Sequence, residues 1–488
     1  MGLLAGEQLG LGDILGHLVL YSIYIWTSYV VCLHVYRVTL HPLARFPGPK
    51  FARASYWYEA WYEVVCGGQY TNKVAKLHQK YGPIIRINPD ELHCNDPDFV
   101  KTVYPVSNRK RDKSSYFMKG FGNPDQSTFM NTNHTHHRTL RAPLSKFFAK
   151  SHVSQAEQQV HEKVQKLCDK LLARRGCAPL DVSGAFSCFA TDSSTEYCYG
   201  SDPCLLDQDT WELNSMAFFE NVERSTHLQR SVPGLLYVVK FVPRFVFKHF
   251  CNSFYSFLDS DEAPISEPLD IILSAIQTDQ IKSTPMYSSL MSSPHTSKTT
   301  AIAQTRDESA ATTLAGPTST AIVLSRIFHY LLSSPSSARR LREELSLAIP
   351  DALQLPRWSA LEQLPYLSAV IHEGLRLMAD GFVGGLPYET SQNRSPRIAT
   401  EEDLPYEFTR HSTKDNLKSE SCKVKYVIPR GFAVSTSAKM MHANESSFPN
   451  ASEFLPERWL DDCGNRNIAL ERELWTWGKG SRHCIGMQ

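Results

Sequence analysis

The stretch Trp477-Gly478-Lys479-Gly480-Ser481-Arg482-His483-Cys484-Ile485-Gly486 lies near the end of the 488-residue chain and is its most informative segment. Its first two glycines permit a tight loop with positive φ angles, in which backbone N–H groups approach a sulfur atom. Arg482 adds positive charge beside Cys484 and should favour the thiolate form of that side chain. Gly486 allows the following segment to lie close to a flat ligand. We therefore expect a loop that presents a single thiolate.

Cys484 has three interpretations. A lone thiolate presented by a glycine-rich loop suits an axial ligand of haem iron. A buried core cysteine is the commoner role of an isolated cysteine. His483 and Cys484 could in principle belong to a zinc site, but no second ligand pair in the sequence has zinc spacing.

Composition excludes several classes of protein. The chain carries 51 Lys and Arg against 50 Asp and Glu, a net charge of +1, and 42% of its residues are hydrophobic. The charge balance excludes a nucleic-acid binder that relies on bulk electrostatics, and the apolar content excludes a disordered chain. The 12 cysteines are scattered without a CxxC pair, which favours reduced thiols facing the cytosol over a disulfide framework.

Two charged motifs precede the cysteine loop. In Glu373-Gly374-Leu375-Arg376 the acid and the arginine stand at i and i+3, so they share one helix face and can pair. On a protein surface such a pair contributes well under ~1 kcal/mol. The segment Phe454-Leu455-Pro456-Glu457-Arg458-Trp459 adds a further arginine close to the loop.

A third motif is basic. In His137-Arg138-Thr139-Leu140-Arg141 the first and last residues are four apart on an expected helix and project the same way. Arginine at such a position pairs well with a carboxylate. Read alone, this cluster is more often a solvated basic face.

Taken together and in this order, the motifs resemble those of the cytochrome P450 family. The family's haem loop reads aromatic, two spacers, Gly, any, Arg, any, Cys, any, Gly. Trp477, Gly480, Arg482, Cys484 and Gly486 fit this pattern, and Gly478 lies among the spacers. The resemblance implies that this loop binds haem b and that Cys484 is the axial ligand of its iron.

The resemblance also implies roles for the other motifs. Arg458 would join Glu373 and Arg376 in a buried triad that fixes the proximal scaffold and is costly to break. His137 and Arg141 would hold a haem propionate. A further propionate contact would come from Arg397, in the strand-like segment Arg394-Ser395-Pro396-Arg397-Ile398-Ala399.

The segment Ala315-Gly316-Pro317-Thr318-Ser319-Thr320 resembles the family's oxygen-activation motif, in which a small pair is followed by an acid and an alcohol. The small pair leaves room for dioxygen, and Ser319 takes the alcohol position that assists proton delivery. Thr318 replaces the acid, so Thr318, Thr320 and water would have to substitute for a carboxylate. Pro317 should kink this helix, and a kinked core helix is the alternative interpretation.

Hydrophobic patterning predicts a mainly α chain with minor β sheets, as in the cytochrome P450 fold. The expected strands are Ile84–Ile87 and Leu92–Cys94, the expected helices are 153–175, Asp307–Leu332, 336–348 and Tyr366–Leu377, and the expected irregular segments are 276–306 and 384–425.

The N-terminus carries a membrane signal. The run between Asp13 and Arg37 has no charged residue and exceeds the ~20 residues that one spanning helix needs. Basic residues follow the run and acidic residues precede it, so the positive-inside rule places the body on the cytoplasmic side. We expect a membrane anchor over 1–40, a stiff connection at FPGPK (46–50) and a catalytic domain over 41–488. A buried core helix is the alternative for the first segment.

Two features depart from the family pattern. Residues 384–393 look inserted ahead of the strand that holds Arg397. The chain also ends at Gln488, two residues after Gly486. In the family a helix and a hairpin follow the cysteine, so we expect a catalytic domain that is C-terminally incomplete and retains haem less well.

The function implied by the resemblance is a haem-thiolate monooxygenase of the endoplasmic reticulum membrane that oxidises a hydrophobic substrate. Segments such as Tyr81-Gly82-Pro83 and 88–93 resemble fungal secondary-metabolism members, nearest to the trichodiene-oxygenase-like group, which hydroxylates terpenes. NADPH would supply electrons through a cytochrome P450 reductase, with cytochrome b5 as a further candidate partner. Lys479 and Arg138 are candidates for the docking face of the reductase.

Two other functions stay open on sequence grounds. The first is a non-catalytic or degenerate haem-binding remnant, motivated by Thr318, Pro317 and the position of the chain end. The second is an isomerase or dehydratase of oxygenated lipids, which needs no reductase.

Overall fold

The structure is a computed structural model, which describes residues 11–106, 109–121, 126–177, 179–211, 226–232, 279–292, 297–351, 354–378, 394–412 and 420–487. The first elements along the chain are α1 (Leu11–Thr39), α2 (Lys50–Ala54), α3 (Trp57–Ala60), the π-helix η1 (Trp61–Val65), α4 (Tyr70–Tyr81), β1 (Ile84–Asn88), β2 (Glu91–Cys94), α5 (Pro97–Val103), β3 (Arg111–Lys113) and α6 (Ser115–Met118).

The helical part and the C-terminal elements follow. They are α7 (His134–Phe147), α8 (Lys150–Val153), α9 (Glu157–Ala173), α10 (Val182–Tyr199), α16 (Pro285–Met291), α17 (Lys298–Ser333), α18 (Pro335–Ala348), α19 (Trp358–Leu361), α20 (Pro365–Leu377), β4 (Arg397–Ala399), β5 (Leu404–Ser412), β6 (Glu420–Ile428), β7 (Ala433–Ser435), α21 (Ala438–His442) and α22 (Ile468–Glu471). The mainly α fold with small sheets is confirmed.

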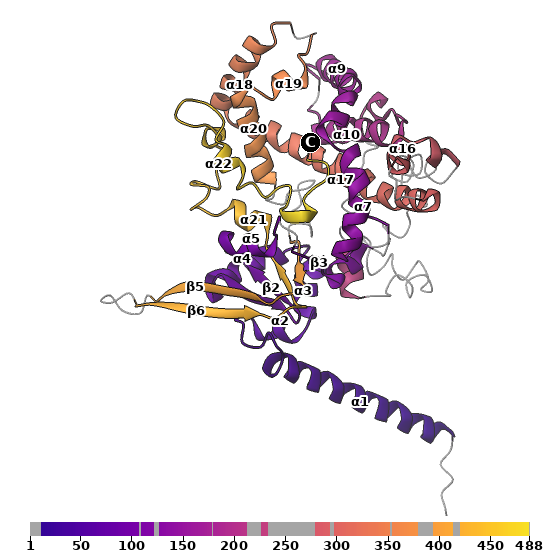
Figure 1. The fold of residues 1–488 in the computed structure, drawn as a ribbon, viewed down its shortest axis with the longest axis vertical. Helices are drawn as coiled ribbons and strands as arrows, with labels where there is room; N and C mark the ends of the chain where they lie inside the picture. The colour runs from indigo at the N-terminus through magenta and orange to yellow at the C-terminus, as the bar shows by residue number, and fades with distance from the viewer. Residues whose placement is uncertain are drawn as a thin grey trace, which may run out of the picture.

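A five-stranded sheet with the order β1-β2-β7-β4-β3 lies at the end of the body nearest α1, and the helices α9, α10 and α18 to α20 lie at the other end (Figure 1). The two strands predicted around residues 84–94 are confirmed as the antiparallel pair β1 and β2. Strand β7 joins β2 in parallel, and β4 is antiparallel to both β7 and β3. This sheet brings Arg397 of β4 beside Lys113 of β3.

The prediction of irregular structure over 384–425 is wrong in its described part, where β5 and β6 form a long antiparallel hairpin. Leu404 and Tyr406 are buried, and Phe408 packs against the same cluster. Their period of two is the signature of a strand with one buried face, hidden in the sequence by the polar residues of the exposed face. The expected insertion at 384–393 lies outside the described residues.

The helices predicted at 153–175, 336–348 and Tyr366–Leu377 correspond to α9, α18 and α20. The loop predicted at 276–306 is wrong in its described part, because it contains α16 and the first turns of α17. Thr284 caps α16 by accepting a hydrogen bond from the Tyr287 N–H, and Ser297 caps α17 by accepting from Thr300 N–H. The hydroxyl-rich composition therefore marks helix starts here. Helix α17 continues through Pro317.

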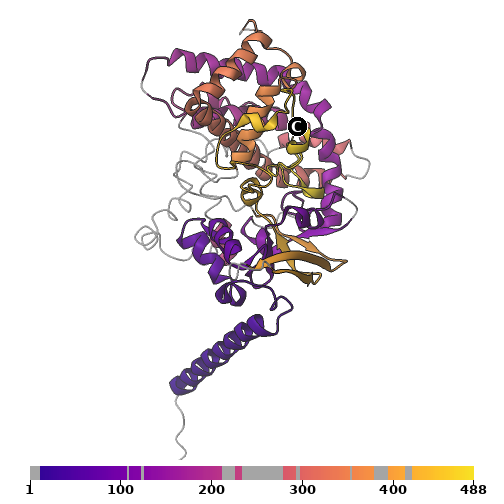
Figure 2. The same ribbon diagram turned by 90° about the vertical axis from the view of Figure 1, so that its left-hand side faces the viewer.

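Helix α1 projects from the body beside α2, as two views at right angles show (Figures 1 and 2). Its segment Ile14–Thr39 is apolar and long enough to cross a membrane, and its hydrophobic side chains are exposed. The FPGPK connection after it is docked on the sheet, since the Arg86 N–H donates to the Pro47 carbonyl at 2.7 Å. A Cβ atom at Gly48 would lie 2.4 Å from the Arg86 carbonyl oxygen, so only glycine permits this approach.

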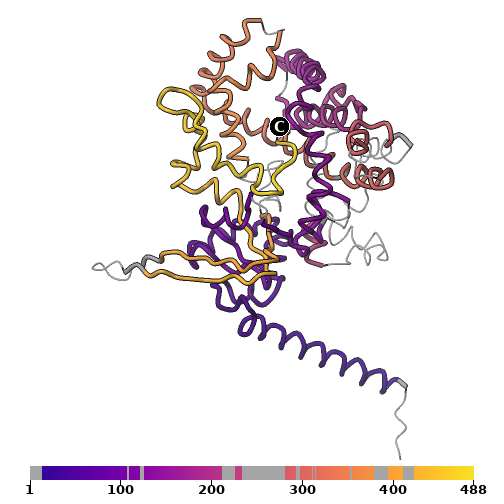
Figure 3. The backbone as a smooth tube through the Cα atoms, in the orientation of Figure 1, coloured from indigo at the N-terminus to yellow at the C-terminus, as the bar shows by residue number. Residues whose placement is uncertain are grey.

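The C-terminal segment, yellow in the tube drawing, returns to lie beside α7 and next to the sheet (Figure 3). Buried clusters flank it. One joins the sheet and hairpin around Leu92 and Val434, and another joins α20 to the C-terminal segment around Leu375 and Trp459. The cysteine loop therefore lies where the helical part meets the sheet.

Candidate functional site

The loop around Cys484 is tight and closed. Gly478 and Gly480 have φ angles of 66° and 76°, as predicted from their type. The Cys484 N–H donates to the Trp477 carbonyl at 2.7 Å and closes the loop. A Cβ atom at Gly480 would lie 3.0 Å from the Tyr104 carbonyl oxygen, so this glycine also allows a close approach to the chain after α5.

The Cys484 thiol is exposed and experiences opposing influences. Desolvation by the surrounding protein raises its pKa, while a hydrogen bond with the Gly486 backbone and the charge of Arg141 lower the pKa. The expectation that Arg482 favours the thiolate is wrong. The Arg482 guanidinium turns away and donates to the carbonyls of Asn131 and Thr132 at 2.6 and 2.7 Å.

The loop is attached to helix α20 and its surroundings. The Thr476 hydroxyl donates to the Leu375 carbonyl at 2.7 Å, one residue from Arg376. The Trp475 N–H donates to Nε2 of His442 at 2.8 Å. The bond to Leu375 therefore ties the cysteine loop to α20, and the bond to His442 ties it to α21.

Glu373, Arg376 and Arg458 meet in one buried network. Arg376 Nη2 lies 2.8 Å from Glu373 Oε1, and Arg458 Nε lies 3.1 Å from the same oxygen. Glu373 also accepts from Trp459 Nε1 at 2.9 Å, a contact that the sequence did not suggest. Arg376 donates to the Ala451 carbonyl at 2.7 Å. Glu373 is 0% and Arg376 1% exposed, so this charge network is desolvated and satisfied by partners.

Helix α7 supplies the basic side of the site. Asn133 caps it by accepting from the His136 N–H, which fixes the helix start. His137 is buried, and desolvation together with nearby Arg482, Lys113 and Arg141 lowers its pKa to about 2. It is therefore a neutral imidazole at physiological pH.

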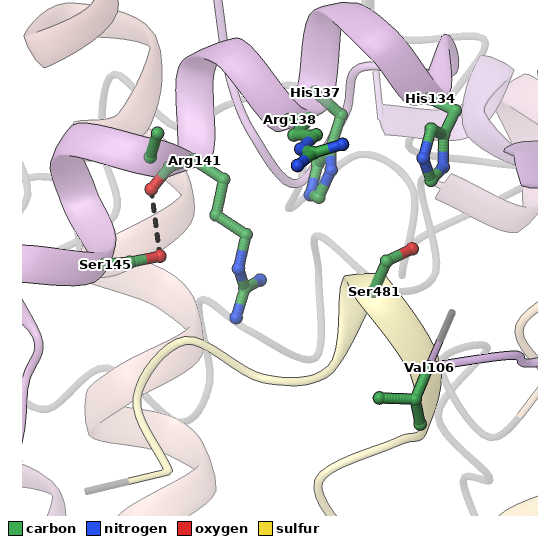
Figure 4. A pocket seen from close by; sticks show the side chains of 8 residues that line it. Val106, His134, His137, Arg138, Arg141, Ser145 and Ser481 are labelled. Carbon is green, nitrogen blue, oxygen red and sulfur yellow. Dashed lines mark hydrogen bonds between the residues drawn. The ribbon is translucent and has the colours of Figure 1, made fainter. Parts of the chain in front are cut away.

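A cavity of about 300 Å³ opens between α7 and the cysteine loop (Figure 4). Its lining consists of Val106, His134, His137, Arg138, Arg141, Ala142, Ser145 and Ser481. In Figure 4 the Arg141 side chain extends from α7 towards the loop, and the imidazoles of His134 and His137 lie along the same side of the helix.

Further cations act on His137, which lines this cavity, although they are not part of its lining. Lys113 of β3, Arg397 of β4 and Arg482 of the loop act on one another electrostatically, and each has a lowered pKa with desolvation as the largest cause. The pKa of Arg482 falls to about 9. Sequence reasoning missed Lys113, although it closes the basic run from Arg109 to Lys113 and thus carried a signal.

The acidic groups acting on these cations are fewer. Glu308 of α17 acts on Lys113 and Arg141, and Asp112 acts on Arg482. The pKa of Glu308 is raised to about 7 by desolvation, so at neutral pH its carboxylate offsets the positive charge only in part. Glu308 was also missed, because a single acid in a helical pattern carries no signal by itself.

This arrangement fits haem. Its two propionates would supply the anions that the cluster lacks, and the buried Arg482 Nε atom has no hydrogen-bond partner among the described residues. Cys484 would supply the sulfur ligand. For a zinc site, by contrast, no group of three His, Cys, Asp or Glu side chains comes together in the described part of the chain.

The residues of the expected oxygen-activation motif lie on α17. Ser319 donates to the Gly316 carbonyl at 3.3 Å, and Thr320 is exposed. Ala315 and Gly316 are exposed, and a Cβ atom at Gly316 would lie 3.9 Å from Ser194 Cβ of α10. Thr318 is buried, and its hydroxyl oxygen has no partner within the described residues. A buried hydroxyl without a hydrogen-bond partner lowers the stability of the fold by roughly 1–3 kcal/mol.

The fold and the loop that presents Cys484 are those expected of a haem-binding class of protein, and comparison with known families agrees. The model of the family described as cytochrome P450 matches residues 47–384 and 405–488, so the chain belongs to the cytochrome P450 family. The unmatched stretch 385–404 contains most of the expected insertion and also Arg397.

The relatives are fungal enzymes. The cytochrome P450 monooxygenase ppzE of Metarhizium majus is 51% identical over 460 residues, which is 94% of this chain and 95% of that relative. The ppzE protein of Metarhizium rileyi is 37% identical over 96% of this chain and 86% of its own length. The monooxygenase TRI4 of Fusarium sporotrichioides is 32% identical over 92% of this chain and 81% of its own. The similarity to the group expected from the sequence is thus present, at lower identity than to ppzE.

Proposed function

We propose that this protein is a haem-thiolate monooxygenase that inserts one oxygen atom from O2 into a hydrophobic fungal metabolite, a terpenoid or another secondary metabolite. Bound haem would supply the oxygen activation and C–H oxidation that thiolate-ligated haem performs in this family. The observation that carries the proposal is the closed loop that presents the exposed Cys484 thiol beside Arg141 and the cation cluster.

The protein's own residues would divide the work. Cys484 binds the iron through its sulfur. Arg141, Arg397, Arg482 and His137 orient the propionates, three by charge and the neutral imidazole by hydrogen bonding. We add Lys113 to this set, because it belongs to the same cation cluster.

The remaining site residues would position groups or handle protons. The triad of Glu373, Arg376 and Arg458 holds the proximal scaffold through the bonds of α20 to the loop. Ser319, whose hydroxyl donates to the Gly316 carbonyl, would supply a hydroxyl for proton delivery to bound oxygen. The buried Thr318 hydroxyl, which has no partner within the described residues, would be able to bind water. Proton delivery by neutral hydroxyls and water is slower than by a carboxylic acid.

The cellular setting follows from α1 and from the need for electrons. We infer that α1 anchors residues 1–40 in the endoplasmic reticulum membrane as a single span, with the catalytic domain of 41–488 in the cytosol. A membrane-bound NADPH-cytochrome P450 reductase would then deliver electrons. Lys479 and Arg138 would contribute to its docking face, with cytochrome b5 as a second donor.

The test is spectroscopic and kinetic. Full-length protein in reductase-containing membranes is reduced and exposed to carbon monoxide, and the thiolate-type Soret band is expected. Its absence would favour the haem-binding remnant. Candidate sesquiterpenes and other hydrophobic metabolites are then supplied with and without NADPH. Product formed only with NADPH supports the monooxygenase, and product formed without NADPH supports the isomerase or dehydratase.

A further inference from the structure

Helix α17 contains two acidic residues, Asp307 and Glu308, and their environments differ. Glu308 is 3% exposed, and its Oε1 atom accepts a hydrogen bond from the Thr128 N–H at 2.5 Å. Asp307 is less buried. It accepts from the Gln126 N–H at 3.1 Å and lies 3.4 Å from Nε of Arg306. Glu308 is therefore the acid that this helix places inside the protein.

Groups from three other elements interact electrostatically with Glu308. Lys113 of β3 acts on Glu308 and favours its carboxylate form. Arg141 of α7 and the hydroxyl of Tyr199 of α10 are influenced by the charge of Glu308. Arg141 is influenced by Cys484 as well, and its own charge favours the Cys484 thiolate. Arg141 is thus a common electrostatic partner of the buried acid and the cysteine.

The position of Glu308 along α17 limits what it can do. Glu308 and Ser319 are 11 positions apart, about three helical turns, so both project from the same face of the helix. At roughly 1.5 Å per residue, their Cα atoms lie about 16 Å apart along the helix axis. Direct proton transfer needs hydrogen-bond distance or a single bridging water. Glu308 is therefore too far from Ser319 to pass a proton to it, and the influence left to it is electrostatic.

Glu308 exchanges its proton near neutral pH, whereas the imidazoles that line the cavity do not. Desolvation raises the pKa of Glu308 to about 7, hydrogen bonds with Thr128 oppose this rise, and the adjacent Asp307 adds to it. The pKa of His137 is lowered to about 2, and that of His134 is lowered as well, in both cases chiefly by desolvation. Added negative charge at the site would therefore be met by protonation of Glu308 before protonation of either imidazole.

We propose that Glu308 is a redox-linked proton site, which binds a proton when the haem iron is reduced and thereby sets how the reduction potential of the haem depends on pH. The inference rests on the proposed function. One electron, delivered from NADPH through the reductase, converts Fe(III) to Fe(II), and one proton from solvent binds the Glu308 carboxylate. The negative charge added at the haem is matched by the negative charge removed at Glu308. Because Glu308 acts through Arg141 and Lys113, it is a positioning residue.

The direction of the effect follows from electrostatics. Reduction makes the haem region more negative, so the pKa of Glu308 is higher in the reduced protein than in the oxidised protein. Between these two pKa values the reduced protein binds more protons, so the reduction potential falls as the pH rises through neutrality. The hydroxyl of Thr318, at the acid position of the family motif, does not ionise in this range and cannot supply such a linkage.

The test is a redox titration of the full chain with bound haem, followed by absorbance at several values between about pH 6 and pH 8. The proteins are the wild type, Glu308→Gln and the control Asp192→Asn. Asp192 of α10 is also a buried acid, accepts the N–H groups of Leu205 and Leu206 at 2.9 Å, and has its pKa raised to about 6 by desolvation. The cation that acts on it is Lys163, outside the haem site. We expect the wild type and Asp192→Asn to share one slope of potential against pH, and Glu308→Gln to lose most of it.

The reduced carbon monoxide spectrum of the same samples separates the two proposals. If the wild type lacks the thiolate-type band, the proposed function fails and the inference fails with it. If the band is present, a wild-type potential that does not vary with pH, or an equal slope in Glu308→Gln, overturns the inference alone. Should Glu308→Gln not retain haem, Glu308→Asp decides, because its shorter acid should move the pH range of the slope. An unchanged range, or loss of haem in both variants, would leave Glu308 a structural role only and overturn the inference.

Discussion

At the scale of single residues, the state of the Cys484 thiol depends on its surroundings. Desolvation favours the neutral thiol, whereas Arg141 and the Gly486 backbone favour the thiolate. A ferric ion bound to the sulfur would displace the proton outright. The cysteine thus needs the iron to become a stable thiolate, and Arg141 assists by reducing the cost.

We expect Cys484→Ala to abolish the thiolate-type carbon monoxide spectrum, because the variant loop contains no other sulfur atom before Met487. The matched control is Cys463→Ala, which removes another exposed free thiol from the same C-terminal segment. The measurement is the reduced difference spectrum of both variants. An unchanged spectrum in Cys484→Ala would show that the iron ligand lies elsewhere.

Ser319→Ala should uncouple electron use from product formation. We expect product per NADPH to fall by about tenfold, less than the ~10²–10⁴-fold effect of losing a well-placed proton donor, because Thr318, Thr320 and water remain. Peroxide released per NADPH should rise in Ser319→Ala. In Thr318→Glu the peroxide yield should fall, because this change places a carboxyl group at the position of the acid.

The control for Ser319→Ala is Ser325→Ala on the same helix, whose hydroxyl donates to the Ala321 carbonyl at 2.7 Å. Product and peroxide yields are measured for all variants in reductase-containing membranes. If Ser319→Ala and Ser325→Ala both match the wild type, residues 315–320 do not activate oxygen.

At the scale of elements, the contact between α17 and α20 depends on a missing side chain. A Cβ atom at Gly374 would lie 2.2 Å from Ile327 Cγ1. Glycine therefore lets α20 approach α17 closely enough for Glu373 and Arg376 to be buried between helix and loop. Gly374, which lies between Glu373 and Arg376 in the sequence, thus permits the helix packing that buries this charged network.

Breaking that network should unfold the scaffold rather than alter selectivity. We expect Arg376→Ala to lower the free energy of unfolding by about 3–5 kcal/mol, because Glu373 is left buried with fewer partners. The pair Asp98 and Lys101 has the same i, i+3 spacing at 3.2 Å but is exposed, so Lys101→Ala should cost less than ~1 kcal/mol. Denaturant unfolding and haem content check both variants. Equal losses would contradict the special role of the buried network.

At the scale of the whole molecule, buried neutral histidines tie stability to pH. Burial lowers the pKa of His78 from 6.5 to about 4 and that of His442 to about 3. His78 Nε2 lies 2.8 Å from His93 Nδ1, so protonation would also place two cations in contact. Below pH 6.5 these imidazoles bind protons in the unfolded chain, whereas in the folded protein they bind protons only near their lowered pKa values.

The sign of the effect follows from these lowered values. The stabilising contribution is present above the unfolded pKa of 6.5 and is lost as the pH falls towards the folded pKa values. At about pH 5 we expect the contribution of each of His78 and His442 to the free energy of unfolding to be about 2 kcal/mol smaller than above pH 6.5.

The measurement for this prediction is the denaturant midpoint between about pH 7.5 and pH 5. His78→Gln should reduce the slope of stability against pH. The exposed His136 provides the control, since His136→Gln should leave that slope unchanged. A wild-type midpoint that does not fall on acidification would contradict the prediction.

Local sequence patterns are sufficient to predict several features of this protein. Glycines at 478 and 480 dictate positive φ angles, and the apolar run before Arg37 dictates a long helix. The long periodic helices and the strands around residues 84–94 follow from side-chain periodicity of 3.6 and 2. These features require no knowledge of distant partners, because neighbouring residues already fix the backbone.

Which side chains meet at the site depends on how distant elements pack, and local patterns do not reveal it. Lys113 and Glu308 come from a strand and a helix that lie far apart in the chain, so no spacing in the sequence reveals that they act on one another electrostatically. The electrostatic partner of Cys484 proved to be Arg141 of α7 rather than the adjacent Arg482, because the turn of the loop points the nearer guanidinium towards Asn131 and Thr132. Electrostatic energy depends on distance through space and on burial, and both are set when separate elements pack against one another.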